Sequence, residues 1–333
     1  MDTIYIESSV RDHPRVQAVL DRHPKSIVVE CERYGEVFNL RSQNFRLQKK
    51  RPALILARKH GNPVLPTPPA YSIGAAENFY FSHMLNCLYD CRYCFLQGMY
   101  QSANYLHFVN YEDFEEAIDA SEPSSAGPAC FFSGYDCDSL ALESLTGFAE
   151  HFVPFFSARP DKWLELRTKS INTAVLEQSD PVPNVIVAFT LSPDVIAREI
   201  EHGAPSFERR LKRVKSLTQQ GWGVGLRLDP LIPWPGFEKL YPDMVDRIFS
   251  EVDPAMVHSV TLGPMRFPKA MYERIMKLYP YDRLFALEEM ALRDGQMTYP
   301  AQIEEDLIEL VQSQILRYLD SAKVFRQTGS SSG

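Results

Sequence analysis

Short apolar runs alternate with amphipathic stretches between residues 76 and 280 of the chain. Apolar runs that end at polar or turn-forming residues are typical of buried strands. They predict strands over 78–82, 129–133, 162–168, 185–190, 223–228 and 256–262. Helical spacing between these runs predicts helices over 110–118, 139–156, 207–220, 237–251 and 269–278. Asn110 is the expected cap of the first helix.

Six strand-then-helix units predict an α/β fold with a parallel sheet and right-handed crossovers. The count fits a partial (β/α)6 barrel of the TIM type, which we assign to residues 76–280. In such sheets, ligands bind at the C-terminal ends of the strands. Side chains that follow the predicted strands are therefore the first candidates for a functional site.

Two extensions flank the predicted barrel. The N-terminal extension, residues 1–75, has strand-like runs at 26–31 and 51–58 and a proline-rich connector at 62–70. The C-terminal extension, residues 281–333, ends in the Gly- and Ser-rich tail 328–333, which we expect to be floppy. The chain is thus expected to divide near residues 75 and 280.

The chain has 333 residues and a formal net charge of −8 at pH 7, so its net charge does not attract nucleic acid. The segment Leu40–Asn62 is a local exception, because it contains no acidic residue. Its basic residues are Arg41, Arg46, Lys49, Lys50, Arg51, Arg58, Lys59 and His60. The segment is either a surface that contacts phosphates or a solvated face, and charge alone does not separate the two.

The cellular setting is expected from two absences in the sequence. The first seven residues are too short and too polar for a signal peptide, and no apolar run approaches the roughly 18 residues that a membrane span needs. We therefore expect a cytoplasmic protein with no membrane partner, whose six cysteines stay reduced.

Three cysteines, Cys87, Cys91 and Cys94, form a C-x3-C-x2-C motif directly after the first predicted strand. Three thiolates fill three corners of a [4Fe–4S] cluster and leave its fourth iron open. The open iron can chelate S-adenosylmethionine (SAM), and electron transfer then releases a 5′-deoxyadenosyl radical. This spacing, with Tyr93 before the last cysteine, indicates the radical SAM superfamily. Tyr93 can relay a hydrogen atom or pack on SAM.

A zinc site is the simpler alternative, because His83 and His107 can add nitrogen ligands to the three thiols. However, C-x2-C pairs that bind zinc usually recur, and no second cysteine pair follows here. An electron carrier would shield all four irons with protein ligands, whereas the motif supplies three. The motif therefore favours a cluster that binds SAM.

The loop at 133–138, after the second predicted strand, faces the same end of the barrel as the cysteine motif. Its Cys137 has three possible roles: a hydrogen donor to a substrate radical, a polar contact to SAM, or a small semi-buried residue. Lys169 ends the third predicted strand, where a cation can meet the SAM carboxylate or a substrate phosphate. The alternative for Lys169 is a surface lysine before a helix.

The fourth and fifth predicted strands end in further polar residues. Thr190 and Ser192 can hydrogen-bond the SAM ribose, although short polar residues are common at strand ends. Arg227 can anchor an anion with two parallel hydrogen bonds, and Asp229 follows it. Arg227 and Asp229 can instead form a structural ion pair.

Together these motifs lead to a family. Between about residues 26 and 310, the chain resembles the spore photoproduct lyase family of radical SAM enzymes. Asn104-Tyr-Leu-His-Phe-Val-Asn110 is similar to the family's Tyr-Leu-Arg-Leu-Phe-Val-Asn, and Pro205-Ser-Phe-Glu-Arg-Arg-Leu211 is similar to its Ser-Ser-Phe-Asp-x-Arg-Leu. Further similar segments are 139–146, 168–169, 189–190 and 266–269.

The resemblance implies a radical SAM barrel that repairs a thymine dimer photoproduct in DNA, with a [4Fe–4S] cluster and SAM as cofactors. It also implies a reducing electron donor such as flavodoxin or ferredoxin. The 5′-deoxyadenosyl radical takes hydrogen from the lesion, the methylene bridge between the thymines breaks, and a protein donor quenches the thymine radical. Because the lesion must leave the base stack, DNA contacts are expected from Lys49, Lys50, Arg51 and Arg266.

Two sites depart from the family pattern. The family has Ala-Cys-Thr-Ser-Asp after the second strand, with the cysteine as hydrogen donor. When the two sequences are aligned on Asp138, Tyr135 occupies the position of that cysteine, and Cys137 occupies the position of the serine that helps hold SAM. The second departure is Phe95, which replaces the tyrosine that follows the last cluster cysteine in the family. We therefore expect Cys137 or Tyr135 to quench the product radical, or that radical to have another fate, or the substrate to differ. The alternative functions are action on another nucleic-acid lesion or nucleotide, and a non-catalytic iron–sulfur protein that binds nucleic acid.

Overall fold

The structure is a computed structural model that describes residues 1–41, 43–68, 71–121, 127–287 and 290–327. Its largest sheet has eight strands among these residues. In spatial order they are β18 (Val324–Arg326), β14 (Val257–Pro264), β13 (Gly223–Leu231), β11 (Val185–Thr190), β10 (Lys162–Thr168), β9 (Ala129–Ser133), β5 (Glu77–Phe81) and β4 (Val64–Pro66). The six strands from β5 to β14 pair in parallel, which confirms the predicted strands and the parallel sheet.

Two edge strands of this sheet lie outside the sequence prediction. β18 pairs in parallel with β14, and β4 pairs antiparallel with β5. β4 belongs to the proline-rich connector, where proline is tolerated because an edge strand leaves one row of backbone groups unpaired. Residues 69–70 of that connector and the tail 328–333 lie outside the described residues.

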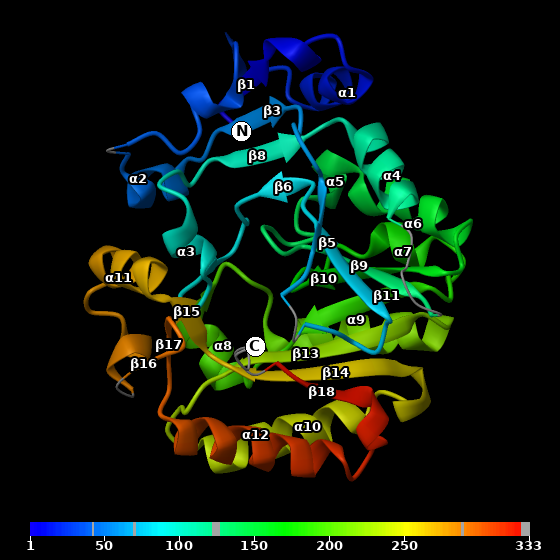
Figure 1. Ribbon diagram of the computed structural model, residues 1–333, viewed down its shortest axis with the longest axis vertical. Helices are drawn as coiled ribbons and strands as arrows, with labels where there is room; N and C mark the ends of the chain where they lie inside the picture. Colours follow the sequence, from blue (N-terminus) through cyan, green and yellow to red (C-terminus); the bar gives the residue numbers. More distant parts are fainter. Residues whose placement is uncertain (42, 69–70, 122–126, 288–289, 328–333) are drawn as a thin grey trace.

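Helices cover the outer side of the sheet and complete the predicted partial barrel, with α12 against β14 and α6 against β10 and β11 (Figure 1). The helices are α1 (Pro14–Arg22), α2 (Phe45–Lys50), α3 (Leu96–Met99), α4 (Tyr111–Ala120), α5 (Glu143–Thr146), α6 (Phe148–Ser157), α7 (Ala174–Glu177), α8 (Asp194–Ile200), α9 (Phe207–Gln220), α10 (Phe237–Phe249), α11 (Lys269–Leu278) and α12 (Ala301–Ile315). Among the described residues, no helix is long and apolar enough to cross a membrane.

Two details of the helix prediction are wrong. The single helix expected over 139–156 is divided into α5 and α6, because Gly147 between them has a left-handed φ of 58°. Asn110 makes no capping hydrogen bond at the start of α4. Its side-chain oxygen instead accepts from the backbone N–H of Lys59 (2.7 Å), and its amide donates to the carbonyl of the same residue (3.1 Å).

A second sheet packs beside the barrel at the N-terminal end of the chain (Figure 1). Its strands lie in the order β2 (Ile27–Cys31), β1 (Thr3–Glu7), β3 (Leu54–Ala57), β8 (Tyr105–Phe108) and β6 (Met84–Leu85). The strands predicted over 26–31 and 51–58 are thus confirmed as β2 and β3. β6 and β8 come from the segment assigned to the barrel, so the N-terminal extension and the barrel segment share one sheet.

The C-terminal extension returns to the barrel. A small antiparallel sheet contains β15 (Arg266–Pro268), β17 (Gln296–Thr298) and β16 (Ala291–Arg293). α12 then packs against α10 and β14, and β18 adds the last strand to the large sheet.

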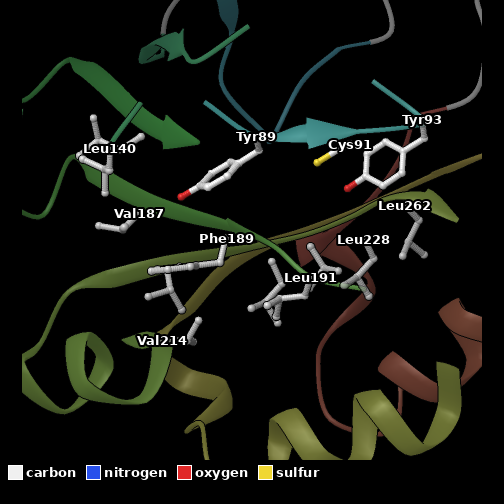
Figure 2. Close-up of a cluster of buried hydrophobic side chains, with 14 of the residues drawn as sticks. Tyr89, Cys91, Tyr93, Leu140, Val187, Phe189, Leu191, Val214, Leu228 and Leu262 are labelled. Carbon is white, nitrogen blue, oxygen red and sulfur yellow. The ribbon is translucent and has the colours of Figure 1, made fainter. Parts of the chain in front are cut away.

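Apolar side chains of the parallel sheet pack towards the helices that cover its outer side. Val187, Phe189 and Leu228 are buried and point to this side (Figure 2). On the opposite side of the sheet, inside the barrel, Arg227 and Glu165 are fully buried and form an ion pair at 2.6 Å. Arg227 also donates to the backbone and hydroxyl oxygens of Ser259 (3.1 and 3.0 Å). The partner of Arg227 is therefore Glu165 on β10, which agrees with a structural ion pair, and a role of Arg227 as an anchor for a bound anion stays a prediction.

We expect Arg227→Met to lower the free energy of unfolding by about 3–5 kcal/mol, because it leaves the Glu165 carboxylate buried without its main counter-charge. The matched control is Arg198→Met, since Arg198 is 74% exposed and pairs with Asp194 one helical turn away. The Arg198→Met control is expected to lower the free energy of unfolding by at most about 0.5 kcal/mol. Chemical denaturation of both variants measures the difference, and equal losses would contradict a structural role for Arg227.

Candidate active site

The cysteine loop, residues 82–95, follows β5 at the C-terminal edge of the parallel sheet. It contains β6, the short strand β7 (Asp90–Cys91) and the turn into α3. The loop covers a cavity of about 450 Å³. This position agrees with the expectation that a ligand binds at the C-terminal strand ends.

The three motif cysteines line this one cavity. Cys91 points from the loop towards the barrel interior, between Tyr89 and Tyr93 (Figure 2). All six cysteines of the chain are free thiols, and Cys31 and Cys130 lie away from the cavity in buried packing. The cavity therefore selects Cys87, Cys91 and Cys94 as a group, with Cys137 as the fourth thiol on its wall.

The donor set fits a cluster held by three thiolates. Burial raises the pKa of Cys87 to about 12 and also raises the pKa of Cys91 and Cys94. Thiolates in such a place need a strong positive counter-charge, which the iron of a cluster supplies when it binds. Among the described residues, no three His, Cys, Asp or Glu side chains are grouped around a position for a single metal ion.

The proposed zinc ligands His83 and His107 have other surroundings. Both rings are buried, and His83 stacks on Phe148 with ring centroids 3.8 Å apart. Burial holds the pKa of each histidine below its usual value, so both rings are neutral core residues. Cys137 contacts one of them, with its Sγ 3.9 Å from Nδ1 of His83.

Hydrogen bonds from Asn86 and from Lys49 of the N-terminal extension hold one side of the cysteine loop. Asn86 adopts a left-handed φ of 70°, and its amide donates to the carbonyls of Ser102 (2.8 Å) and Asn104 (2.7 Å). The ammonium group of Lys49 donates to the carbonyls of Cys87 (2.7 Å) and Tyr89 (3.0 Å). Lys49 was expected to contact DNA phosphates; the structure instead places its charge against the cysteine loop.

Buried charges from the barrel hold the other side of the loop. The strand β12 (Glu201–His202) pairs antiparallel with β7, opposite Cys91. Glu201 accepts hydrogen bonds from the hydroxyl of Tyr93 and from Arg210, and its third donor is the hydroxyl of Ser192 (3.1 Å). Burial alone would raise the pKa of Glu201, but the charges of Arg210 and Lys169 outweigh it and lower that pKa. Glu201 is therefore a charged carboxylate beneath the loop.

The other strand-end residues divide into two groups. Lys169, Thr190 and Asp229 line the cavity, as does Tyr93. Burial alone would lower the pKa of Lys169, but its acidic neighbours, Cys91 first, raise it, so the lysine is charged. Ser192 is turned towards Glu201 instead and does not appear on the cavity wall.

The loop after β9 forms another part of the cavity wall. Tyr135 packs its ring on Tyr80 and Phe95, with centroids 4.7 and 5.5 Å away. Burial raises the pKa of Tyr135 and of Cys137, so both residues keep their hydrogen. Asp138 fixes the loop, because its carboxylate accepts from the hydroxyl of Thr168 and the backbone N–H of Lys169, both at 2.6 Å.

Three residues of the site were missed as functional candidates in the sequence. Glu201 and Asp138 fix the two loops, and Arg167 lines the cavity with its Nε 3.0 Å from Glu165. Arg167 lies at the C-terminal end of the third predicted strand, two residues before Lys169, so strand-end position could have found it. Glu201 had no such signal, because its importance comes from a pairing with β7 more than 100 residues earlier.

The basic residues expected to contact DNA do not form one group. Arg266 lines the cavity, and one of its nitrogens donates to the carbonyl of Gln327. Lys50 and Arg51 lie exposed at the end of α2, outside the cavity. Arg58 is paired with Asp113 at 2.5 Å, and His60 lies 3.0 Å from Glu7. Contacts of Lys50, Arg51 and Arg266 with nucleic acid stay a prediction.

Comparisons with known proteins agree on one family. The spore photoproduct lyase family model matches residues 74–328. A double variant of spore photoproduct lyase with bound AdoMet (SAM) and dinucleoside spore photoproduct has a TM-score of 0.82 at 17% identity, over 99% of this chain and 98% of that chain. Spore photoproduct lyase complexed with the dinucleoside spore photoproduct has a TM-score of 0.81 at 18% identity, over 98% of each chain. No curated protein matches the sequence. At these identities the structural likeness shows the fold.

Gly134 provides a test of how tightly the loop after β9 is packed. A Cβ atom there would lie 2.6 Å from Oγ of Ser139 and 2.9 Å from the carbonyl oxygen of Arg167. We expect Gly134→Ala to lower the free energy of unfolding by about 1–3 kcal/mol more than the control Gly203→Ala. Gly203 has the same φ of 79° and no atom within 4 Å, so the control isolates the steric cost. Thermal or chemical denaturation measures the loss for each variant. If both variants lose the same free energy of unfolding, the neighbours of Gly134 move away from the added Cβ atom at little cost.

Proposed function

The chain belongs to the spore photoproduct lyase family, and on that premise we propose that it is a radical SAM lyase that repairs a thymine dimer photoproduct in DNA. The observation that carries the proposal is the grouping of three motif thiols, a charged lysine and a neutral tyrosine around one cavity at the C-terminal strand ends. When bound, a [4Fe–4S] cluster and SAM supply a 5′-deoxyadenosyl radical that abstracts hydrogen from the lesion.

The residues proposed to hold these cofactors have distinct tasks. Cys87, Cys91 and Cys94 bind the cluster through their sulfur atoms. Lys169 offers its ammonium group to the SAM carboxylate, and Thr190 offers a hydroxyl from the next strand. Tyr93 packs on this part of the cavity, while its hydroxyl is engaged by Glu201. Ser192 is proposed to act through Glu201, which it contacts at 3.1 Å.

The substrate is proposed to enter the same cavity as flipped bases. Tyr71, Phe132 and Tyr135 line it, and aromatic rings stack well on bases. Asp229 and Arg167 also line it, and each has one side-chain atom without a hydrogen-bond partner among the described residues. A carboxylate acceptor beside guanidinium donors suits the imide edge of thymine, and Arg266 adds a further cation.

Tyr135 is proposed as the hydrogen donor that quenches the product radical. Its ring belongs to the aromatic wall of the cavity, and its hydroxyl keeps its proton. Cys137 also lines the cavity, but its sulfur lies near His83 within a second hydrophobic cluster. Tyr135 aligns with the cysteine that donates hydrogen in the family. It is thus proposed to keep that role, with its phenolic O–H bond in place of the S–H bond of the cysteine.

The cluster assignment is tested by replacing each motif cysteine in turn. We expect Cys87→Ala, Cys91→Ala and Cys94→Ala to lose cluster absorption and SAM cleavage, because two thiolates do not hold the cluster stably. Iron analysis after anaerobic reconstitution is expected to fall from about four irons per chain to a small fraction of that value. Cys31→Ala is the control, since this thiol is buried outside the cavity. Full iron content in a motif variant, or tetrahedral zinc in the unaltered protein, would contradict the assignment.

The hydrogen donor is tested with Tyr135→Phe, which keeps the ring and removes only the hydroxyl. We expect SAM cleavage to persist while the yield of intact dithymidine from a defined photoproduct falls at least roughly tenfold. In D2O the unaltered protein should place deuterium from its exchangeable O–H on the product, and the variant should not. Chromatography with mass spectrometry measures both quantities. If Cys137→Ala shows these losses and Tyr135→Phe does not, the thiol is the donor.

A further inference from the structure

One exposed surface beside the cysteine loop is not used by the proposed reaction. It is the outer face of α2, made of Arg46, Leu47, Lys50 and Arg51, which we call the α2 face. All four residues are exposed, and Leu47 is 61% exposed. The opposite side of the same helix is anchored, because Phe45 is buried and Lys49 contacts the loop.

The α2 face is directly connected to the motif cysteines. Lys49 donates to the carbonyls of Cys87 and Tyr89, the two neighbours of Leu88. Leu88 is 43% exposed although it lies next to a motif cysteine. Gln48 also fixes the helix, since its side-chain oxygen accepts from the backbone N–H of Ala103 (3.0 Å). A molecule that rests on the α2 face would therefore be separated from the cysteine loop by the width of this one helix.

We propose that the α2 face, with Leu88, is the docking surface for an acidic one-electron carrier protein that reduces the cluster. This inference rests on the proposed function, which requires one electron for each reduction of the cluster. The reduced carrier is oxidised by one electron and the cluster is reduced by one, with no bond made or broken. A flavin or iron–sulfur protein with an acidic surface is the class of carrier that fits.

Charge and apolar surface together favour this partner. This chain is acidic overall, so an encounter with an acidic carrier needs a local basic patch to orient it. The α2 face supplies three cations. The guanidinium of one of them, Arg46, lies over the ring of Tyr279, and the Tyr279 hydroxyl donates to the side-chain oxygen of Gln97 (3.0 Å). Leu47 and Leu88 give it the apolar centre that protein interfaces have.

A DNA backbone is a poorer occupant of this surface. A lesion base has to enter the cavity, and none of the described cavity-lining residues belongs to α2. Phosphate contacts also gain nothing from exposed leucine side chains. The α2 face and the cavity thus share no residue, which suits an electron source on one surface and a substrate on another.

The test is a charge reversal of the α2 face, Lys50→Glu with Arg51→Glu, in the reconstituted holoenzyme. The probe is a purified bacterial flavodoxin, and its affinity is measured by titration calorimetry at low and high salt. We expect binding to weaken at least about tenfold and to lose most of its salt dependence. Leu88→Ser should slow electron transfer from flavodoxin hydroquinone to the cluster. The matched control is Arg209→Glu with Lys212→Glu, two exposed cations on α9.

Two further measurements separate this proposal from the proposed function. SAM cleavage driven by dithionite, which needs no docking, is expected to be unchanged in the α2 variant. Absence of dithionite-driven cleavage in the unaltered protein would refute the proposed function itself. Unchanged flavodoxin affinity in the α2 variant would overturn the docking proposal. A loss of DNA affinity with unchanged flavodoxin affinity would also overturn it and assign the α2 face to nucleic acid.

Discussion

The position of the cysteine loop depends on one buried carboxylate, Glu201. This residue pairs with Arg210, accepts from Tyr93 and Ser192, and belongs to the strand that pairs with β7. Separating Glu201 from Arg210 would leave a charge buried and unpaired, which is costly. The loop is thereby tied to the end of the fourth barrel strand. Both the direction of Cys91 and the shape of the cavity follow from that connection.

In a second set of paired charges, one carboxylate binds both a fully buried arginine and an arginine that reaches the cavity. Glu165 binds Arg227, which is fully buried, and Arg167, which reaches the cavity wall. Arg167 also lies 3.6 Å from Asp229. One buried carboxylate thus holds one arginine inside the barrel and positions another on the cavity wall. Such a network keeps its members in fixed orientations because each loss leaves a neighbour unsatisfied.

The basic segment Leu40–Asn62 shows how folding distributes a run of like charges. Lys49 binds carbonyls of the cysteine loop, Arg58 pairs with Asp113, and His60 approaches Glu7. The outer side of α2 keeps its cations exposed. A charge run that looks uniform in the sequence therefore serves several different contacts, and only part of it remains for a partner.

The sequence by itself determined the parallel barrel, the position of the cysteine loop at its C-terminal edge and the family, because strand–helix alternation and cysteine spacing are local patterns. It did not determine the partner of Arg227, which is Glu165, 62 residues away, nor the task of Lys49. It also did not reveal β1, β8 and β18, since short strands gain their stability from neighbours distant in the chain. Only the tertiary structure decided these features, because a buried charge takes whichever counter-charge the strand register brings within reach.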